Sequence, residues 1–111
     1  MAEEIDRRVL AFRPKREEFH GSIRRIAFED RHVYLSDHAK TRMDQRSITR
    51  VDVVRVLQRG HIEGEIVPGN SLGEWKCKVV ANVKGSREIG VVSLIINDER
   101  ILVKTVEWED L

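Results

Sequence analysis

The chain has 111 residues, 41% of them hydrophobic, which fits one compact domain with a modest core rather than two domains. It contains 20 lysines and arginines and 19 aspartates and glutamates, so the formal net charge of +1 indicates no class of partner. A single cysteine excludes an internal disulfide. The sequence shows no apolar run long enough to span a bilayer and no signal-peptide core, so we expect a cytoplasmic protein without a membrane partner.

Positive charge is concentrated in the first half of the chain. Residues 1–59 contain 14 lysines and arginines against 10 aspartates and glutamates, whereas residues 60–111 contain 6 against 9. The basic excess therefore belongs to the half whose hydrophobic pattern predicts helices.

The chain is expected to begin with an arm and one core helix. Residues 1–16 form a flexible basic arm or a short helix, and Pro14 ends any helix there. Apolar side chains at helical spacing follow in residues 17–28, and residues 32–35 form a short extended run. We expect residues 17–111 to make a single domain.

Two short helices are predicted next. Ser36 is a suitable N-cap for the first, which breaks at Ser47. Thr49 and Asp52 form a capping-box pattern at the start of the second, and Gly60 closes that helix as the residue beyond its end.

After the second of these helices the hydrophobic period changes from 3.6 to 2, which predicts strands. The expected strands are residues 61–67, 75–83, 89–96 and 101–108. Short turns join them, so consecutive strands should pair as an antiparallel meander. The sequence thus predicts an α+β fold, in which N-terminal helices pack on a C-terminal antiparallel sheet of about four strands.

One helix face carries the strongest candidate for a functional site. His38, Arg42 and Arg46 are spaced four residues apart, so they form a polar ridge beside the apolar pair Ala39 and Met43. Guanidinium groups suit phosphate oxygens, and the helix dipole favours a neutral imidazole at His38, which suits a general base. The ridge therefore meets part of what metal-independent RNA cleavage requires.

Catalysis by this ridge needs a second proton-transfer group. His61 would serve as the acid if the fold brings it near, and Tyr34 and Lys104 are weaker candidates. A purely structural interpretation stays equally open. Carboxylates of the acidic second half would then pair with Arg42 and Arg46, and the ridge would only hold its helix in place.

A family resemblance rests on one block of sequence. That block is His38-Ala39-x-x-Arg42-Met43-x-x-Arg46-x-Ile48-Thr49, and a helix and Gly60-His61-Ile62 follow it. The chain resembles, over about residues 17–107, a bacterial family of domains of unknown function that looks related to RelE-like toxins, including the MqsR-like and BrnT-like groups. The resemblance implies a RelE-like fold and a toxin-type ribonuclease neutralised by a partner protein. It assigns no roles to the ridge residues.

Two functions of different class follow from these observations. The first is a toxin-type RNA endonuclease of a toxin–antitoxin pair, with RNA and an antitoxin-like protein as partners. The second is a non-catalytic protein-interaction module that uses an exposed sheet edge or a Trp-bearing terminus.

Other chemistry is not expected. We predict no cofactor, and no metal site because the sequence has neither a HExxH motif nor paired cysteines. Cys77 lies in an alternating segment and is predicted to be a small buried side chain rather than a nucleophile. Trp75 and Trp108 are expected to serve the core or a protein interface.

Overall fold

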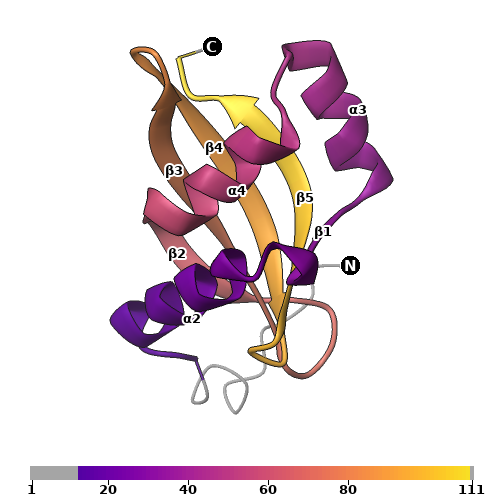
Figure 1. Cartoon of the computed structure of the whole chain (residues 1–111). Helices are drawn as coiled ribbons and strands as arrows, with labels where there is room; N and C mark the ends of the chain where they lie inside the picture. The colour runs from indigo at the N-terminus through magenta and orange to yellow at the C-terminus, as the bar shows by residue number, and fades with distance from the viewer. Residues whose placement is uncertain (1–12, 111) are drawn as a thin grey trace.

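The order of elements confirms the predicted α+β class (Figure 1). The computed structural model describes residues 13–110, so most of the arm expected at residues 1–16 lies outside the described part. The elements are α2 (Arg16–Phe28), η1 (Asp30–His32), β1 (Val33–Leu35), α3 (Asp37–Arg46), α4 (Arg50–Arg59), β2 (His61–Pro68), β3 (Glu74–Lys84), β4 (Arg87–Ile96) and β5 (Arg100–Trp108).

The sheet contains one strand more than expected. Its order is β1-β5-β4-β3-β2, and β2 to β5 form the predicted antiparallel meander. β1 adds to the outer edge of β5 in parallel, with Tyr34 opposite Leu102, so the sheet is mixed. Three residues are too few to show a period in the sequence, and their partner strand lies at the far end of the chain.

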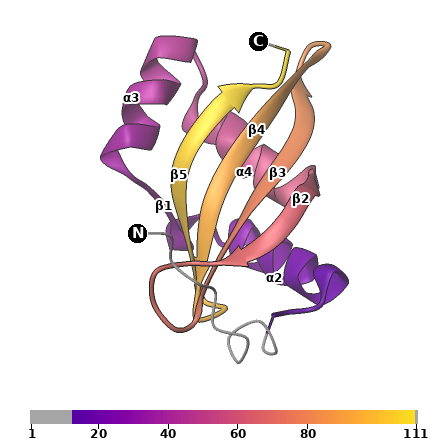
Figure 2. The ribbon, with the colours of Figure 1, turned by 180° about the vertical axis from the view of Figure 1, so that it is seen from behind.

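Helices cover one face of the sheet. α4 packs against β3 and β4, and α2 packs against α4. α3 packs against β5 at the edge of the sheet. Figure 2 shows the opposite face of the sheet, where none of the described helices lies. In residues 13–110 no helix is both long and apolar enough to cross a membrane.

The core fills the space between the sheet and these helices. The apolar stripe of α2 is buried, as its spacing predicts, and it packs on the buried valines and leucine of α4. Alternate residues of the strands, including Val79, Val91 and Val103, complete the core. Trp75 and Trp108 pack against its margin, as expected.

The helix termini confirm the predicted capping residues. The Ser36 hydroxyl accepts a hydrogen bond from the Ala39 N–H at 3.0 Å. α3 ends at Ser47, whose φ of 56° is left-handed. Thr49 and Asp52 form a reciprocal capping box, with distances of 3.2 Å from the Asp52 N–H to the Thr49 hydroxyl and 2.9 Å from the Thr49 N–H to the Asp52 carboxylate.

Gly60 follows α4 as predicted, but a left-handed turn is not the reason that glycine is needed there. Its backbone is extended, with φ of −78° and ψ of −178°. A Cβ at this position would lie 2.6 Å from the carbonyl oxygens of Val56 and Val80. Glycine therefore lets the end of α4 approach the backbone of β3 closely.

Replacing Gly60 by alanine should destabilise the protein strongly. The added methyl meets two backbone oxygens that cannot move aside independently, so the Gly60→Ala variant should lose about 3 kcal/mol of unfolding free energy. Gly21→Ala is the matched control, because Gly21 is exposed inside α2 and a Cβ there meets nothing within 4 Å. That control should gain about 0.5–1 kcal/mol. Urea unfolding of both variants tests the prediction, and equal stabilities would contradict it.

Candidate functional site

The start of α3 is fastened to β5. The Ser36 N–H donates to the Val103 carbonyl at 3.0 Å, and the Ser36 hydroxyl donates to the Lys104 carbonyl at 3.2 Å. Ala39 and Met43 are buried beneath the helix. These contacts set the orientation of α3 at the β1–β5 edge of the sheet, and with it the side on which the ridge lies.

The ridge residues differ in exposure. His38 is exposed, whereas Arg42 and Arg46 are half-buried. Arg42 donates to the Gln45 side-chain oxygen at 3.0 Å, within the same helix. In the described part of the chain, no carboxylate forms an ion pair with any of the three. The alternative of internal salt bridges is therefore not what residues 13–110 show.

Carboxylates of the second half pair with other cations instead. Asp98 pairs with Arg25 at 3.1 Å. On the helix-free face, the Lys78 ammonium lies 2.6 Å from Glu109 and 3.2 Å from Glu107. Burial alone would lower the pKa of Lys78, but hydrogen bonds to these two glutamates outweigh it and raise that pKa. The acidic residues thus neutralise cations away from α3.

Arg46 joins the end of α3 to the last strand. Its carbonyl oxygen accepts a hydrogen bond of 3.1 Å from the indole N–H of Trp108. The Arg87 guanidinium lies 3.9 Å from the centre of the same indole ring, at cation–π distance. The Nη1 atom of Arg46 is buried and has no hydrogen-bond partner among the described residues. An unpaired buried donor costs about 1–3 kcal/mol, so this atom adds a cost to the folded state.

The two weaker candidates of the sequence lie at the same edge as the ridge. Val92 pairs with Thr105 and Ser93 with Val103, so Lys104 is the extra residue of a β-bulge in β5. Lys104 is exposed, and its carbonyl carries the hydrogen bond from the start of α3. Tyr34 belongs to β1, four residues before His38. The sequence did not indicate that both lie at this edge, because neither the bulge nor the β1–β5 pairing has a sequence signal.

His61 does not join the ridge. It opens β2, where it is exposed and pairs with Val80. β2 and β1 are the two opposite edges of the sheet, and α3 packs on the β1–β5 side (Figure 1). The width of the sheet therefore separates His61 from His38, and the predicted acid lies far from the predicted base.

The β2 edge is closed by side chains of α2. Arg16 donates to the carbonyls of Ile62 and Gly64, the latter at 2.7 Å. The His20 imidazole Nε2 donates to the Gly60 carbonyl at 2.6 Å. Because these three carbonyls already have partners, a peptide cannot pair with them unless the α2 side chains move away.

Residues 13–110 contain no cluster of three or more His, Cys, Asp or Glu side chains that could hold a metal ion. Cys77 is buried in β3. Burial raises the pKa of its thiol to about 12, although the charge of Arg16 opposes that shift. Cys77 is therefore a core side chain, as predicted, and not a nucleophile.

The buried thiol should be inert in the native protein. At pH 8 we expect no reaction of Cys77 with an aromatic disulfide reagent, and one thiol per chain after denaturation. Because the folded pKa is raised, the unfolded chain ionises first, so stability should fall as the pH rises from about 9 towards 12. Rapid labelling of the folded protein would contradict this assignment.

The turn between α3 and α4 depends on an ionised Asp52. Burial alone would raise the pKa of Asp52, but hydrogen bonds from Thr49 and from the Lys84 ammonium, 3.1 Å away, outweigh it and lower that pKa. Lys84 also donates to the Ser47 carbonyl at 3.2 Å. One lysine thus ties the end of β3 to both helices.

Stability should therefore depend on Asp52 in acid. A lowered folded pKa stabilises the protein above the unfolded pKa of 3.8, and this contribution is lost as the pH falls through the folded pKa. We expect Asp52→Asn to cost about 1–2 kcal/mol at pH 7, and the difference from wild type to shrink below pH 4. Urea unfolding across this pH range measures the stability difference between the variant and wild type. A difference that does not change with pH would contradict the role of an ionised Asp52.

Comparison with known proteins bears on the same region. The model of a protein family described as a domain of unknown function, DUF4258, matches residues 35–108. This stretch begins at the end of β1 and includes α3, α4 and β2 to β5. Neither the curated proteins nor the solved structures gave a match. The family description states no activity, so the likeness to RelE-like toxins stays a prediction. Because the match covers more than half of the chain, the protein belongs to the DUF4258 family.

Proposed function

We propose that this protein binds RNA through the α3 ridge and cleaves it as a toxin-type endoribonuclease. One observation carries the proposal. His38, Arg42 and Arg46 share one helix face, and no carboxylate of residues 13–110 pairs with them, whereas Arg25 and Lys78 have acidic partners. Arginines that are not neutralised internally retain their attraction for phosphate.

Lys104 extends the cationic surface to the start of α3. It is the bulged residue of β5, and its backbone is hydrogen-bonded to Ser36, two residues before His38. In this proposal Arg42 and Arg46 bind phosphate oxygens, and His38 and Lys104 provide the proton-transfer groups. All four residues belong to α3 or β5. In this proposal Lys104, and not His61, is the proton-transfer partner of His38.

The reaction that suits this set needs no metal. The His38 imidazole takes the proton of a ribose 2′-hydroxyl, and the 2′-oxygen attacks the adjacent phosphorus. The bond from phosphorus to the 5′-oxygen breaks, and the Lys104 ammonium gives that oxygen its proton. The products are a 2′,3′-cyclic phosphate and a 5′-hydroxyl. Arg42 and Arg46 stabilise the charge that builds on the phosphorane oxygens.

A toxin of this kind is held inactive by a partner protein. The proposed antitoxin would cover α3, and its acidic side chains would pair with the arginines that lack carboxylate partners in the described structure. Such a complex should lose RNA binding while the fold is unchanged.

Arg42→Gln should weaken RNA binding and its salt dependence together. Losing one phosphate contact should reduce the slope of log affinity against log salt by about 0.7, as expected for a single strand. Arg55→Gln is the control, because Arg55 is also a helical arginine but lies on α4, where it is exposed. Fluorescence anisotropy with a short single-stranded RNA measures both. Equal slopes for wild type and Arg42→Gln would contradict the role of the ridge.

His38→Asn separates binding from cleavage. It should bind RNA like wild type but leave a labelled RNA intact, and EDTA should not inhibit the wild-type protein. If the His38→Asn variant cleaves RNA at the wild-type rate, the imidazole has no role in the reaction. If the wild-type protein shows no RNA association at low salt but binds a protein partner independently of salt, the non-catalytic interaction module is the correct function.

A further inference from the structure

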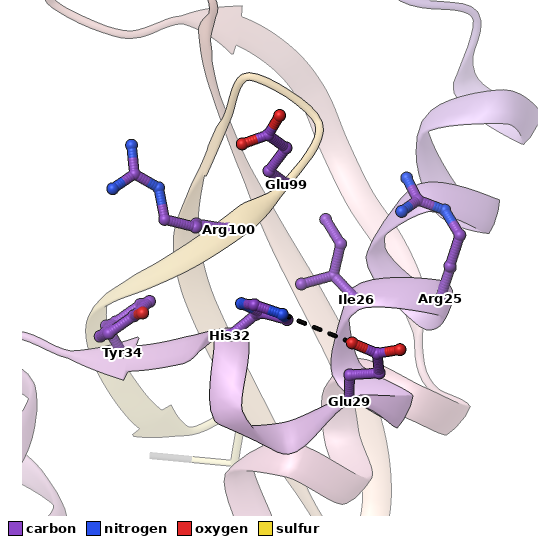
Figure 3. A pocket seen from close by; sticks show the side chains of 7 residues that line it. All are labelled: Arg25, Ile26, Glu29, His32, Tyr34, Glu99 and Arg100. Atoms are coloured by element: carbon purple, nitrogen blue, oxygen red, sulfur yellow. Dashed lines mark ion pairs between the residues drawn. The ribbon is translucent and has the colours of Figure 1, made fainter.

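A pocket lies at the end of β1 that is farther from α3 (Figure 3). It has a volume of about 700 Å³ and lies between the end of α2, η1, β1 and the turn from β4 to β5. Pockets of this size are typical of small-molecule and cofactor sites. We infer that it takes one unstacked guanine base of the RNA whose phosphates lie on α3, an inference that rests on the proposed function.

The charges of the pocket favour an uncharged ring over a phosphate. Two arginines, Arg25 and Arg100, and two glutamates, Glu29 and Glu99, line it, so the formal charges cancel. Arg25 is already paired with Asp98 at 3.1 Å. The pocket thus lacks the positive excess of a phosphate site, and an RNA strand would place its phosphates on the ridge instead.

The pocket also offers planar groups for stacking. Tyr34 is 49% exposed, an unusual exposure for a large aromatic side chain, and it lies next to Arg100 (Figure 3). The His32 imidazole, 3.4 Å from Glu29, and the side chain of Ile26 also line the pocket. Proteins commonly recognise single-stranded RNA by such rings, because the exposed face of an unstacked base can stack on a protein aromatic ring.

Two side chains select the base, one from the end of the β4–β5 turn and one from the first residue of β5. Neither Glu99 nor Arg100 forms an ion pair with any residue from 13 to 110, so a carboxylate and a guanidinium are both available at the rim. Guanine matches both groups. Its O6 and N7 accept the two hydrogen bonds of an arginine fork, and its N1–H and N2–H groups donate to a carboxylate. The other three bases lack this combination of an acceptor edge and a donor edge.

The distance to the ridge suits one continuous strand. Tyr34 and His38 are four residues apart, so their Cα atoms are separated by at most about 14 Å. Tyr34 of β1 lines the pocket, and β1 leads directly to the start of α3 (Figure 1). A base in the pocket and the phosphates of neighbouring nucleotides on α3 can therefore belong to the same short RNA.

The test compares two RNA hexamers, one of uridines only and one with a single central guanosine. Wild type should bind the second about tenfold more tightly, as expected for one well-placed bidentate contact. Arg100→Gln and Glu99→Gln should abolish that preference. Tyr34→Leu should weaken binding of both hexamers by about tenfold, whereas Tyr34→Phe, which keeps the ring, should bind like wild type. Lys76→Gln, an exposed position on β3, is the control and should change nothing.

The outcomes separate this inference from the proposed function. If both hexamers bind equally and Tyr34→Leu has no effect, while Arg42→Gln still weakens binding, the pocket does not hold a base and the ridge remains a phosphate site. If neither hexamer binds wild type at low salt, both proposals fail. Unfolding curves of each variant show whether a loss of binding reflects a loss of structure.

Discussion

The parallel pairing of β1 with β5 is the contact on which the rest of the structure depends. It joins Val33–Leu35 to Ile101–Val103 and so connects the helical half of the chain to its last strand. The backbone N–H of Ser36 continues the pairing by donating to Val103, and α3 begins immediately after it. The pocket lies at one end of this short strand and the ridge follows the other, so both candidate regions take their positions from the same few hydrogen bonds.

A short strand that pairs so far along the chain needs other contacts to hold it. Closing the loop between β1 and β5 costs conformational entropy that three residue pairs do not offset alone. Arg50 contributes by donating to the Val33 carbonyl at 2.9 Å, and α3 contributes through Ala39 and Met43, which are buried against the core. At the far end of α3, the indole of Trp108 binds the Arg46 carbonyl. The helix is therefore held at both ends by β5, which sets the direction of its polar face.

Ion pairs hold several separate elements of the fold together, but none of them involves the ridge. Lys78, Lys84 and Arg87 each hold a carboxylate and join separate elements of the fold. The ridge of α3 carries two arginines for which the described residues supply no such partner, even though the second half of the chain is rich in acids. Because the two ridge arginines have no carboxylate partner among the described residues, they add no ion pair to the stability of the fold.

Much of the fold could be predicted because its signals are local. The Ser36 cap, the Thr49–Asp52 capping box and the four strands of the meander each depend on residues close together in the chain. The candidate site was only partly predictable. The four-residue spacing of His38, Arg42 and Arg46 placed them on one helix face, but no local pattern gave the position of that helix relative to His61.

The sequence by itself determined the elements, their order and the shared face of the ridge, because helix and strand periods are properties of neighbouring residues. Only the tertiary structure decided which groups meet. Sheet order placed His61 at the opposite edge, a bulge put Lys104 beside the start of α3, and pairing with β5 brought Tyr34 next to Arg100. These outcomes depend on contacts between segments that are far apart in the sequence. Packing of the whole chain determines the free energies of such contacts, and they produce no periodic pattern in the sequence.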